Sequence, residues 1–120
     1  MKRGAARGGF QPFIIGPQEV TLTSIDVRGI VIGQRIQIKI EVGWEKPIHW
    51  DTGEMEIIIR RDALDGPVVY WSQEACFEKC LLIETYSEAA TQANHSYYLG
   101  VRSEESRAIM TGPYYLSALI

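Results

Sequence analysis

The stretch QRIQIKIEV, residues 34–42, decides the fold class. From Ile36 to Val42 every even-numbered residue is a branched apolar one, and from Gln37 to Glu41 every odd-numbered residue is polar or charged. Because side chains along an extended strand point alternately to opposite faces, this period of two predicts a strand with one face on a core and the other in water.

The same alternation recurs along the chain, and no segment has the period of a convincing helix. The further expected strands are Val20–Val27, Glu54–Arg61, Pro67–Ser72, Glu74–Tyr86, His95–Arg102 and Arg107–Ile120. A change of parity at Thr23–Ser24 indicates a bulge, and the glycines around Ile30–Ile32 allow a tight turn. Glu74–Tyr86 reads as one long strand or two short ones. We therefore expect an all-β, single two-sheet sandwich of seven to eight strands, jelly-roll-like, with an immunoglobulin-like topology as the alternative.

Composition limits the functional classes. The chain has 120 residues, 46% of them apolar and 22% charged, which suits one soluble domain with one core. A net charge of −3 creates no field that would attract nucleic acid. No segment approaches the ~20 apolar residues of a membrane span, and no cleaved secretory signal is evident at the start.

A short apolar segment precedes the first long strand. Residues 8–20 read GGFQPFIIGPQEV, with large apolar side chains set between glycines and prolines. We expect residues 1–17 to form a connector arm and residues 18–120 to form the sandwich. The residues expected to be donated by the arm to a neighbouring subunit are Phe10, Pro12, Phe13, Ile14 and Ile15.

The arm has two interpretations. An exposed sheet edge presents unpaired N–H and C=O groups, which a strand from another copy can satisfy. Burying such side chains contributes about 1.5–3 kcal/mol each before ordering costs. Repeated head-to-tail donation gives an open filament unless the geometry closes a ring. The alternative is that the segment folds back as a strand of its own sandwich.

Cys76 and Cys80 stand four residues apart in EACFEKC. In a continuous strand their Cα atoms would be ~13 Å apart, too far for a disulfide. Three interpretations stay open: buried small apolar residues, a local disulfide across a tight loop at Phe77–Lys79, or cross-links to other copies.

Residues with catalytic or ligand-binding chemistry are few. His49, near Asp51, and His95 are the candidates for acid–base chemistry near neutral pH, but no nucleophile motif or phosphate-binding loop accompanies them. Asn94–Ser96 matches a glycosylation sequon. Scattered acidic loop residues could bind calcium but lack a loop pattern; they are Asp51, Glu54, Asp62 and Asp65. We therefore expect no enzyme, no cofactor and no metal site.

Two longer segments carry a family resemblance. The closing RAIMTGPYYLSALI, residues 107–120, and the middle segments GQRIQIKIEVGWE and MEIIIRRDALDGPVVY resemble small β-sandwich proteins of Bacillus-type spore surfaces and exosporium. Within that group the chain is similar in design to the fibre-forming subunits of endospore appendages. The resemblance implies a jelly roll whose N-terminal connector docks into the next subunit. The residues near the C-terminus differ from those usual in that family, and the chain lacks a cysteine-rich connector. The resemblance therefore implies no covalent linkage through the N-terminus.

From these observations we expect a structural subunit that assembles head to tail into an extracellular filament at the spore surface. Its expected partners are copies of itself and an anchoring or tip protein, with no nucleic acid and no membrane span. The rival is a carbohydrate- or receptor-binding module that uses exposed aromatic residues. Those aromatic residues are Trp44, Trp50, Tyr70 and Trp71.

Overall fold

The computed structural model describes residues 4–5 and 11–120, and these residues form strands and loops with no helix. The strands are β1 (Gly4–Ala5), β2 (Phe13–Ile15), β3 (Val20–Val27), β4 (Arg35–Glu45), β5 (Gly53–Arg61), β6 (Val68–Cys76), β7 (Lys79–Ala89), β8 (His95–Arg102) and β9 (Ala108–Leu119).

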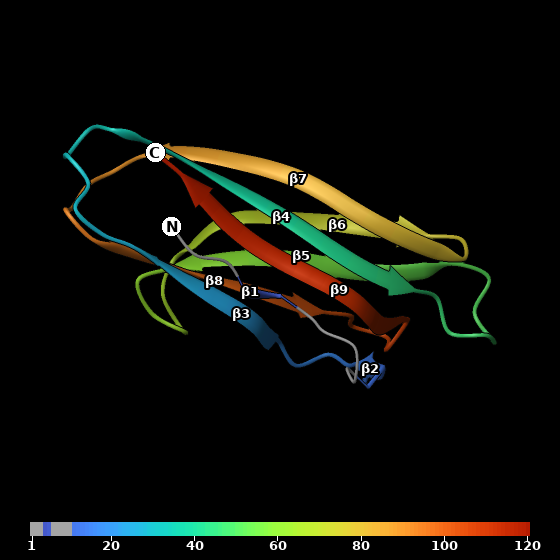
Figure 1. Ribbon diagram of the computed structural model, residues 1–120. Helices are drawn as coiled ribbons and strands as arrows, with labels where there is room; N and C mark the ends of the chain where they lie inside the picture. The colour runs from blue at the N-terminus through green and yellow to red at the C-terminus, as the bar shows by residue number, and fades with distance from the viewer. Residues whose placement is uncertain (1–3, 6–10) are drawn as a thin grey trace.

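The strands form two antiparallel sheets that pack face to face (Figure 1). One sheet has the order β1-β9-β4-β7, with β2 also pairing with β9; the other has the order β3-β8-β5-β6. From β2 onward the pairing is nested: β2 pairs with β9, β3 with β8, β4 with β7, and β5 with β6. This is the ladder of one long hairpin rolled into a sandwich, which is the jelly-roll topology. The predicted all-β sandwich is confirmed.

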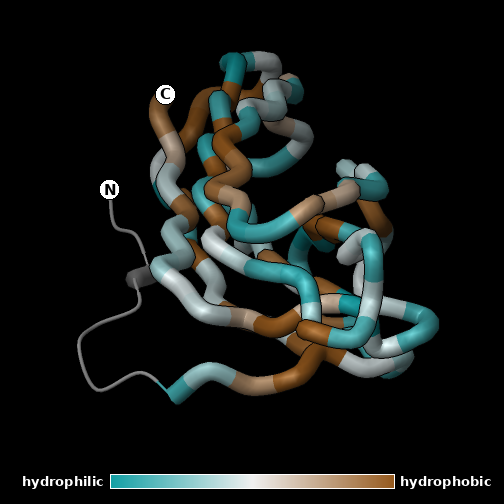
Figure 2. The backbone as a smooth tube through the Cα atoms, turned by 90° about the vertical axis from the view of Figure 1, so that its right-hand side faces the viewer, coloured by the Kyte–Doolittle hydropathy of each residue, from teal (hydrophilic) through white to brown (hydrophobic). Residues whose placement is uncertain are grey.

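The core lies between the two sheets, where the inward faces of the strands meet. β4 is the central strand of its sheet, and its even-numbered residues from Ile36 to Trp44 are at most 1% exposed, as the alternation predicts. From the other sheet, Met55, Ile57 and Ile59 of β5 face them. Figure 2, which views the molecule along its long axis, shows apolar segments alternating with polar ones through both layers.

The expected strands agree with the structure apart from one division. β3 and β8 have the predicted bounds, and β3 carries a bulge between Thr21 and Thr23, next to the expected position. The expected segment Glu74–Tyr86 divides into the end of β6 and the start of β7, with a tight turn at Phe77–Glu78.

In this single chain the residues expected to form a donated strand, Phe13, Ile14 and Ile15, pair with β9 of the same chain, as the alternative interpretation has it. Phe13 pairs with Met110, Ile14 with Ile109 and Ile15 with Ala108. Ile15 is fully buried in the core, and β2 takes the first position in the nested jelly-roll pairing. The physical reason is that the same edge of β9 that could receive a foreign strand lies within reach of this one. Pro12 is exposed beside it, and Phe10 lies outside the described residues.

Candidate functional site

The turn between β3 and β4, residues 28–34, exposes two large apolar side chains in a row. Val31 is 71% exposed and Ile32 is 70% exposed, while Ile30 beside them is buried at 4%. Turns are normally made of glycine, proline and short polar residues. Two large apolar side chains at the tip of a turn therefore need an explanation other than turn formation.

Hydrogen bonds hold this turn to the neighbouring β7–β8 loop. The Ile30 N–H donates to the Ala93 carbonyl at 2.9 Å, and the Gly33 N–H donates to the Ala90 carbonyl at 2.8 Å. Within the turn, the Gln34 N–H donates to the Val31 carbonyl at 2.9 Å, and the Gln34 side-chain oxygen accepts from the Val31 N–H at 3.1 Å. The backbone on both sides of the exposed pair is therefore fixed.

Glycines give the turn its shape. Gly29 and Gly33 have φ angles of +69° and +91°, which L side chains rarely adopt. The Gly29 N–H also donates to the Asn94 side-chain oxygen at 3.3 Å, and the Ala90 N–H donates to the Gln34 carbonyl at 2.8 Å, so four hydrogen bonds join the turn to the same loop. The turn and the loop form one connected unit, which we call the apolar turn (residues 28–34) and its supporting loop (residues 90–94).

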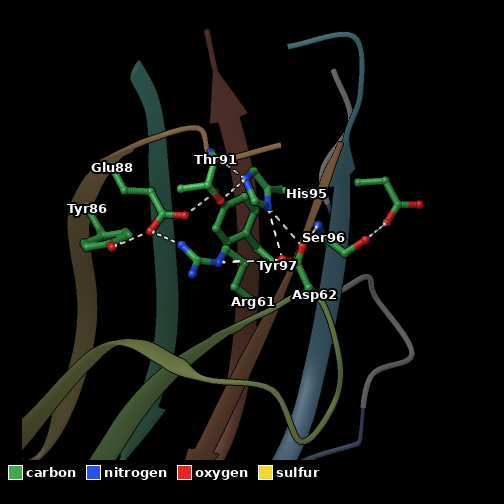
Figure 3. A network of polar contacts seen from close by, with 9 residues as sticks. Arg61, Asp62, Tyr86, Glu88, Thr91, His95, Ser96 and Tyr97 are labelled. Carbon is green, nitrogen blue, oxygen red and sulfur yellow. Dashed lines mark hydrogen bonds and ion pairs between the residues drawn. The ribbon is translucent and has the colours of Figure 1, made fainter. Parts of the chain in front are cut away.

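The His95 side chain links the supporting loop to Asp62, because it lies between Thr91 and Asp62 (Figure 3). Its Nε2 accepts the Thr91 N–H at 3.1 Å, so its Nδ1 carries the proton and donates to Asp62 at 3.1 Å. The Thr91 hydroxyl lies 3.3 Å from the same Nε2, which places a hydroxyl, an imidazole and a carboxylate in a row. The lone pair that a general base would use is already occupied by a backbone N–H, and the His95 side chain is fully buried. In this arrangement the His95 side chain stabilises the supporting loop, and its Nε2 lone pair is not available to act as a general base.

A partly buried carboxylate with three partners completes the support (Figure 3). Glu88, at the end of β7, accepts hydrogen bonds from the hydroxyls of Tyr97 and Tyr86 and from the Arg61 guanidinium at 2.8 Å. Burial by itself would raise the pKa of Glu88, but these hydrogen bonds and the charge of Arg61 outweigh it and hold that pKa below its ordinary value. Burial and the bond to Glu88 raise the pKa of Tyr86 to about 12. The charged Glu88 side chain therefore ties the end of β7, just before the supporting loop, to the strands that carry Arg61 and Tyr97.

The other residues considered for acid–base or metal chemistry do not come together. His49 and Asp51 are exposed in the β4–β5 loop, at the opposite end of the molecule from His95 (Figure 1). Among the described residues, no group of three or more histidine, cysteine, aspartate or glutamate side chains could hold a metal ion, so Glu54, Asp62 and Asp65 form no calcium site with Asp51.

The aromatic residues of the rival interpretation have different environments. Trp44 is buried in the core. Trp50 lies under the Arg107 guanidinium, 4.5 Å from its ring centroid, and helps to hold the β4–β5 loop. Trp71 is 54% exposed on the outer face of the second sheet, and Tyr70 packs partly buried against the core.

Cys76 and Cys80 form a disulfide across the tight turn between β6 and β7. Their Cα atoms are 6.0 Å apart because Phe77 and Glu78 reverse the chain between them. Of the three interpretations left open by the sequence, the structure therefore has the local bridge. Disulfides persist in oxidising compartments and are rare in the cytosol.

No family model matches the chain, and a search of curated proteins also finds no match. The part of the chain that the structure describes contains no helix long and apolar enough to cross a membrane.

Sequence reasoning noted the two glycines around Ile30–Ile32 but did not identify the apolar turn. The signal for it was GIVIG itself, because β-branched apolar residues between two turn-forming glycines either pair in a sheet or are presented outward. Sequence reasoning also did not identify Glu88, whose partners Tyr97 and Arg61 come from two other strands.

Proposed function

We propose that this chain is a structural subunit that assembles with copies of itself into an extracellular fibre. The observation that carries the proposal is the apolar turn, which exposes Val31 and Ile32 on a backbone held by hydrogen bonds to the supporting loop. A rigid apolar projection loses little conformational entropy on association, so it suits a contact between proteins.

The proposed contact lies away from the N-terminal strand. Donation of β2 would require Ile15 to leave the core of its own sheet, where it is fully buried. Figure 1 places the β3–β4 turn, the β5–β6 loop and the C-terminus at one end of the molecule, and several exposed apolar residues belong to these segments. They are Val31, Ile32, Leu64, Leu119 and Ile120. Assembly through this end leaves each jelly roll complete.

Two further points support an extracellular structural role. The Cys76–Cys80 disulfide suits an oxidising location. The histidine best placed for chemistry, His95, is used to brace a loop. The spore surface, and an anchoring or tip protein there, are the setting and the additional partner that the family resemblance implies.

Sedimentation velocity and negative-stain electron microscopy of the intact chain test this proposal. We expect species larger than a monomer that increase with protein concentration, and elongated particles in the images. A chain that sediments as a monomer at the highest concentration reached, under both low and physiological salt, would contradict the proposal.

A second candidate function is a carbohydrate-binding module, favoured by Trp71. The Trp71 indole N–H donates to Glu56 at 2.8 Å, which fixes the ring on the outer face of the sheet while more than half of it stays exposed. Glu56 also accepts from Arg102 at 2.9 Å. A fixed aromatic ring beside charged groups is a surface on which a sugar ring can stack. Glycan-array binding that Trp71→Ala abolishes and Trp71→Phe retains would favour this function over the fibre.

A further inference from the structure

We infer that the outer face of the sheet that contains β4 and β9 binds a neutral oligosaccharide. Four side chains line a pocket of about 340 Å³ on this face; they are Lys39, Glu41, Tyr115 and Ser117. A volume of this order lies within the range of small-molecule sites. The inference goes beyond the proposed fibre, because binding here needs no contact between copies. Its site also differs from the carbohydrate-binding candidate at Trp71, which lies on the other sheet.

Strand alternation and register bring these four side chains together. The even-numbered residues of β4 are buried in the core, so Lys39 and Glu41 point outward. The same holds near the end of β9, where Tyr115 and Ser117 alternate with buried residues. Glu41 pairs with Tyr115 and Lys39 with Ser117, so the pocket spans two rungs of the outer face, about 6.8 Å apart along the strands. Side chains carried by regular strands hold more exact relative positions than those on loops.

The charged groups of the pocket cancel. Lys39 Nζ lies 3.7 Å from Glu41 Oε1, and the two side chains are 52% and 29% exposed. An anionic ligand would meet the carboxylate and a cationic ligand the ammonium group, so neither gains a net attraction. The pair instead presents N–H donors beside carboxylate acceptors, which suits hydroxyl groups because a hydroxyl both donates and accepts.

The rest of the lining is an aromatic ring and a hydroxyl. Tyr115 and Ser117 are both partly exposed. A tyrosine has an apolar ring and a polar tip, so the C–H face of a sugar can pack on the ring while the sugar hydroxyls bond the groups around it. An apolar ligand would desolvate the Lys39–Glu41 pair without replacing its hydrogen bonds. The lining therefore favours a neutral polyhydroxylated ligand.

Side chains beside the pocket continue the same face. Thr85 of β7 lies opposite Lys39, and Ile83 lies opposite Glu41. Gln37 is one rung further along β4 and is exposed, as are Thr85 and Ile83. These positions add a hydroxyl, an amide and an apolar surface next to the pocket. A ligand longer than one sugar can use them, and for that reason we assign an oligosaccharide.

Isothermal titration calorimetry with defined hexasaccharides tests the inference. The neutral probes are cellohexaose, xylohexaose, mannohexaose and N-acetylchitohexaose, and the anionic probe is hexagalacturonate. We expect a neutral probe to bind the intact chain, and Tyr115→Ala to weaken that binding about tenfold through loss of the stacked ring. Tyr115→Phe keeps the ring and should bind within about twofold of the intact chain.

Two further variants serve as an independent measure and a control. Glu41→Ala removes only a surface carboxylate, so it should fold like the intact chain and weaken the same binding about fivefold through a lost hydrogen bond. Trp71→Ala removes an exposed aromatic side chain from the outer face of the other sheet and should leave the binding unchanged.

The outcomes separate this inference from both candidate functions. It is overturned if no neutral probe binds at millimolar concentration, or if binding survives both Tyr115→Ala and Glu41→Ala. Loss of binding in Trp71→Ala with retention in Tyr115→Ala overturns it in favour of the site at Trp71. Tighter binding of hexagalacturonate than of every neutral probe overturns the assignment of a neutral ligand. The fibre stands or falls separately, with the sedimentation of the intact chain.

Discussion

Two short apolar stretches, Phe13–Ile15 and Ile30–Ile32, look alike in the sequence and differ in their backbone partners in the structure. Each is three large apolar residues followed by glycine. The first pairs with β9, buries Ile15 completely and leaves only Ile14 mostly exposed, at 64%, whereas the second buries Ile30 and presents its two other side chains at about 70% exposure. The difference lies in the backbone partners: a sheet edge aligns one stretch with the core, and a loop bonded at Ile30 and Gly33 bends the other outward. Apolar composition alone therefore does not identify an interface.

The largest expected difference between the two stretches is in stability. Ile15→Ala should lower the free energy of unfolding by about 2–5 kcal/mol, because it opens a cavity in the core. Ile32→Ala should change it by no more than about 0.5 kcal/mol, because that side chain is mostly in water. Urea unfolding monitored by tryptophan fluorescence, at protein concentrations where the chain is monomeric, measures both. Equal losses for the two variants would show that the comparison is wrong.

The glycines that follow the two stretches should also respond differently. At Gly33, φ is +91° and the space that an added Cβ would take is open to 4 Å, so Gly33→Ala should cost about 1–2 kcal/mol through backbone strain alone. At Gly16 an added Cβ would make an ordinary 3.8 Å contact with Ser106 Oγ, so Gly16→Ala should be neutral or stabilise by up to about 1 kcal/mol. Thermal unfolding of the two variants provides the measurement, and a stabilising Gly33→Ala would refute the strained turn.

Acidification should reduce the local stability of the apolar turn more than that of β2. The pKa of Glu88 lies below its ordinary value of 4.5, so the stability that this carboxylate contributes is present above pH 4.5 and is lost as the pH falls through the lowered pKa. Amide-exchange protection factors at Ile30 and Gly33 should therefore fall on acidification through this range more than those at Ile15. In Glu88→Gln the pH dependence at Ile30 and Gly33 should be reduced, and an unchanged dependence would remove Glu88 from this role.

The smallest expected change is in apparent mass after cross-linking of β2 to β9. Ile14 and Ile109 are register partners, so cysteines at both positions lie within the Cα separation of a disulfide. Oxidised Ile14→Cys/Ile109→Cys should migrate as a monomer on a non-reducing gel, with Ile14→Cys alone as the control. A ladder of covalent multimers would instead show that neighbouring copies exchange the strand.

Much of the fold could be predicted because its signal is local. The alternation in β4 and the bounds of β3 and β8 follow from side-chain period. The division between β6 and β7 could not, because CFEKC has no glycine, proline or asparagine to mark a turn. Jelly-roll and immunoglobulin-like topologies could not be separated, because they differ only in which distant strands pair. The apolar turn was hidden for a related reason: its outward direction depends on hydrogen bonds to Ala90 and Ala93, about sixty residues away in the chain.

The nested pairing has a consequence for how the protein is made. β2 leaves the ribosome before β3 to β8, and its partner β9 leaves after all of them. Phe13 and its neighbours therefore cannot form their ladder until β9 has been synthesised. The pairing of β2 with β9 is then the last strand pairing of the jelly roll to form. Pairings between such distant segments are slow to form, and the unpaired edge is open to aggregation until they do. The appearance of β9, rather than the gradual emergence of the strands before it, is the event that completes this sheet.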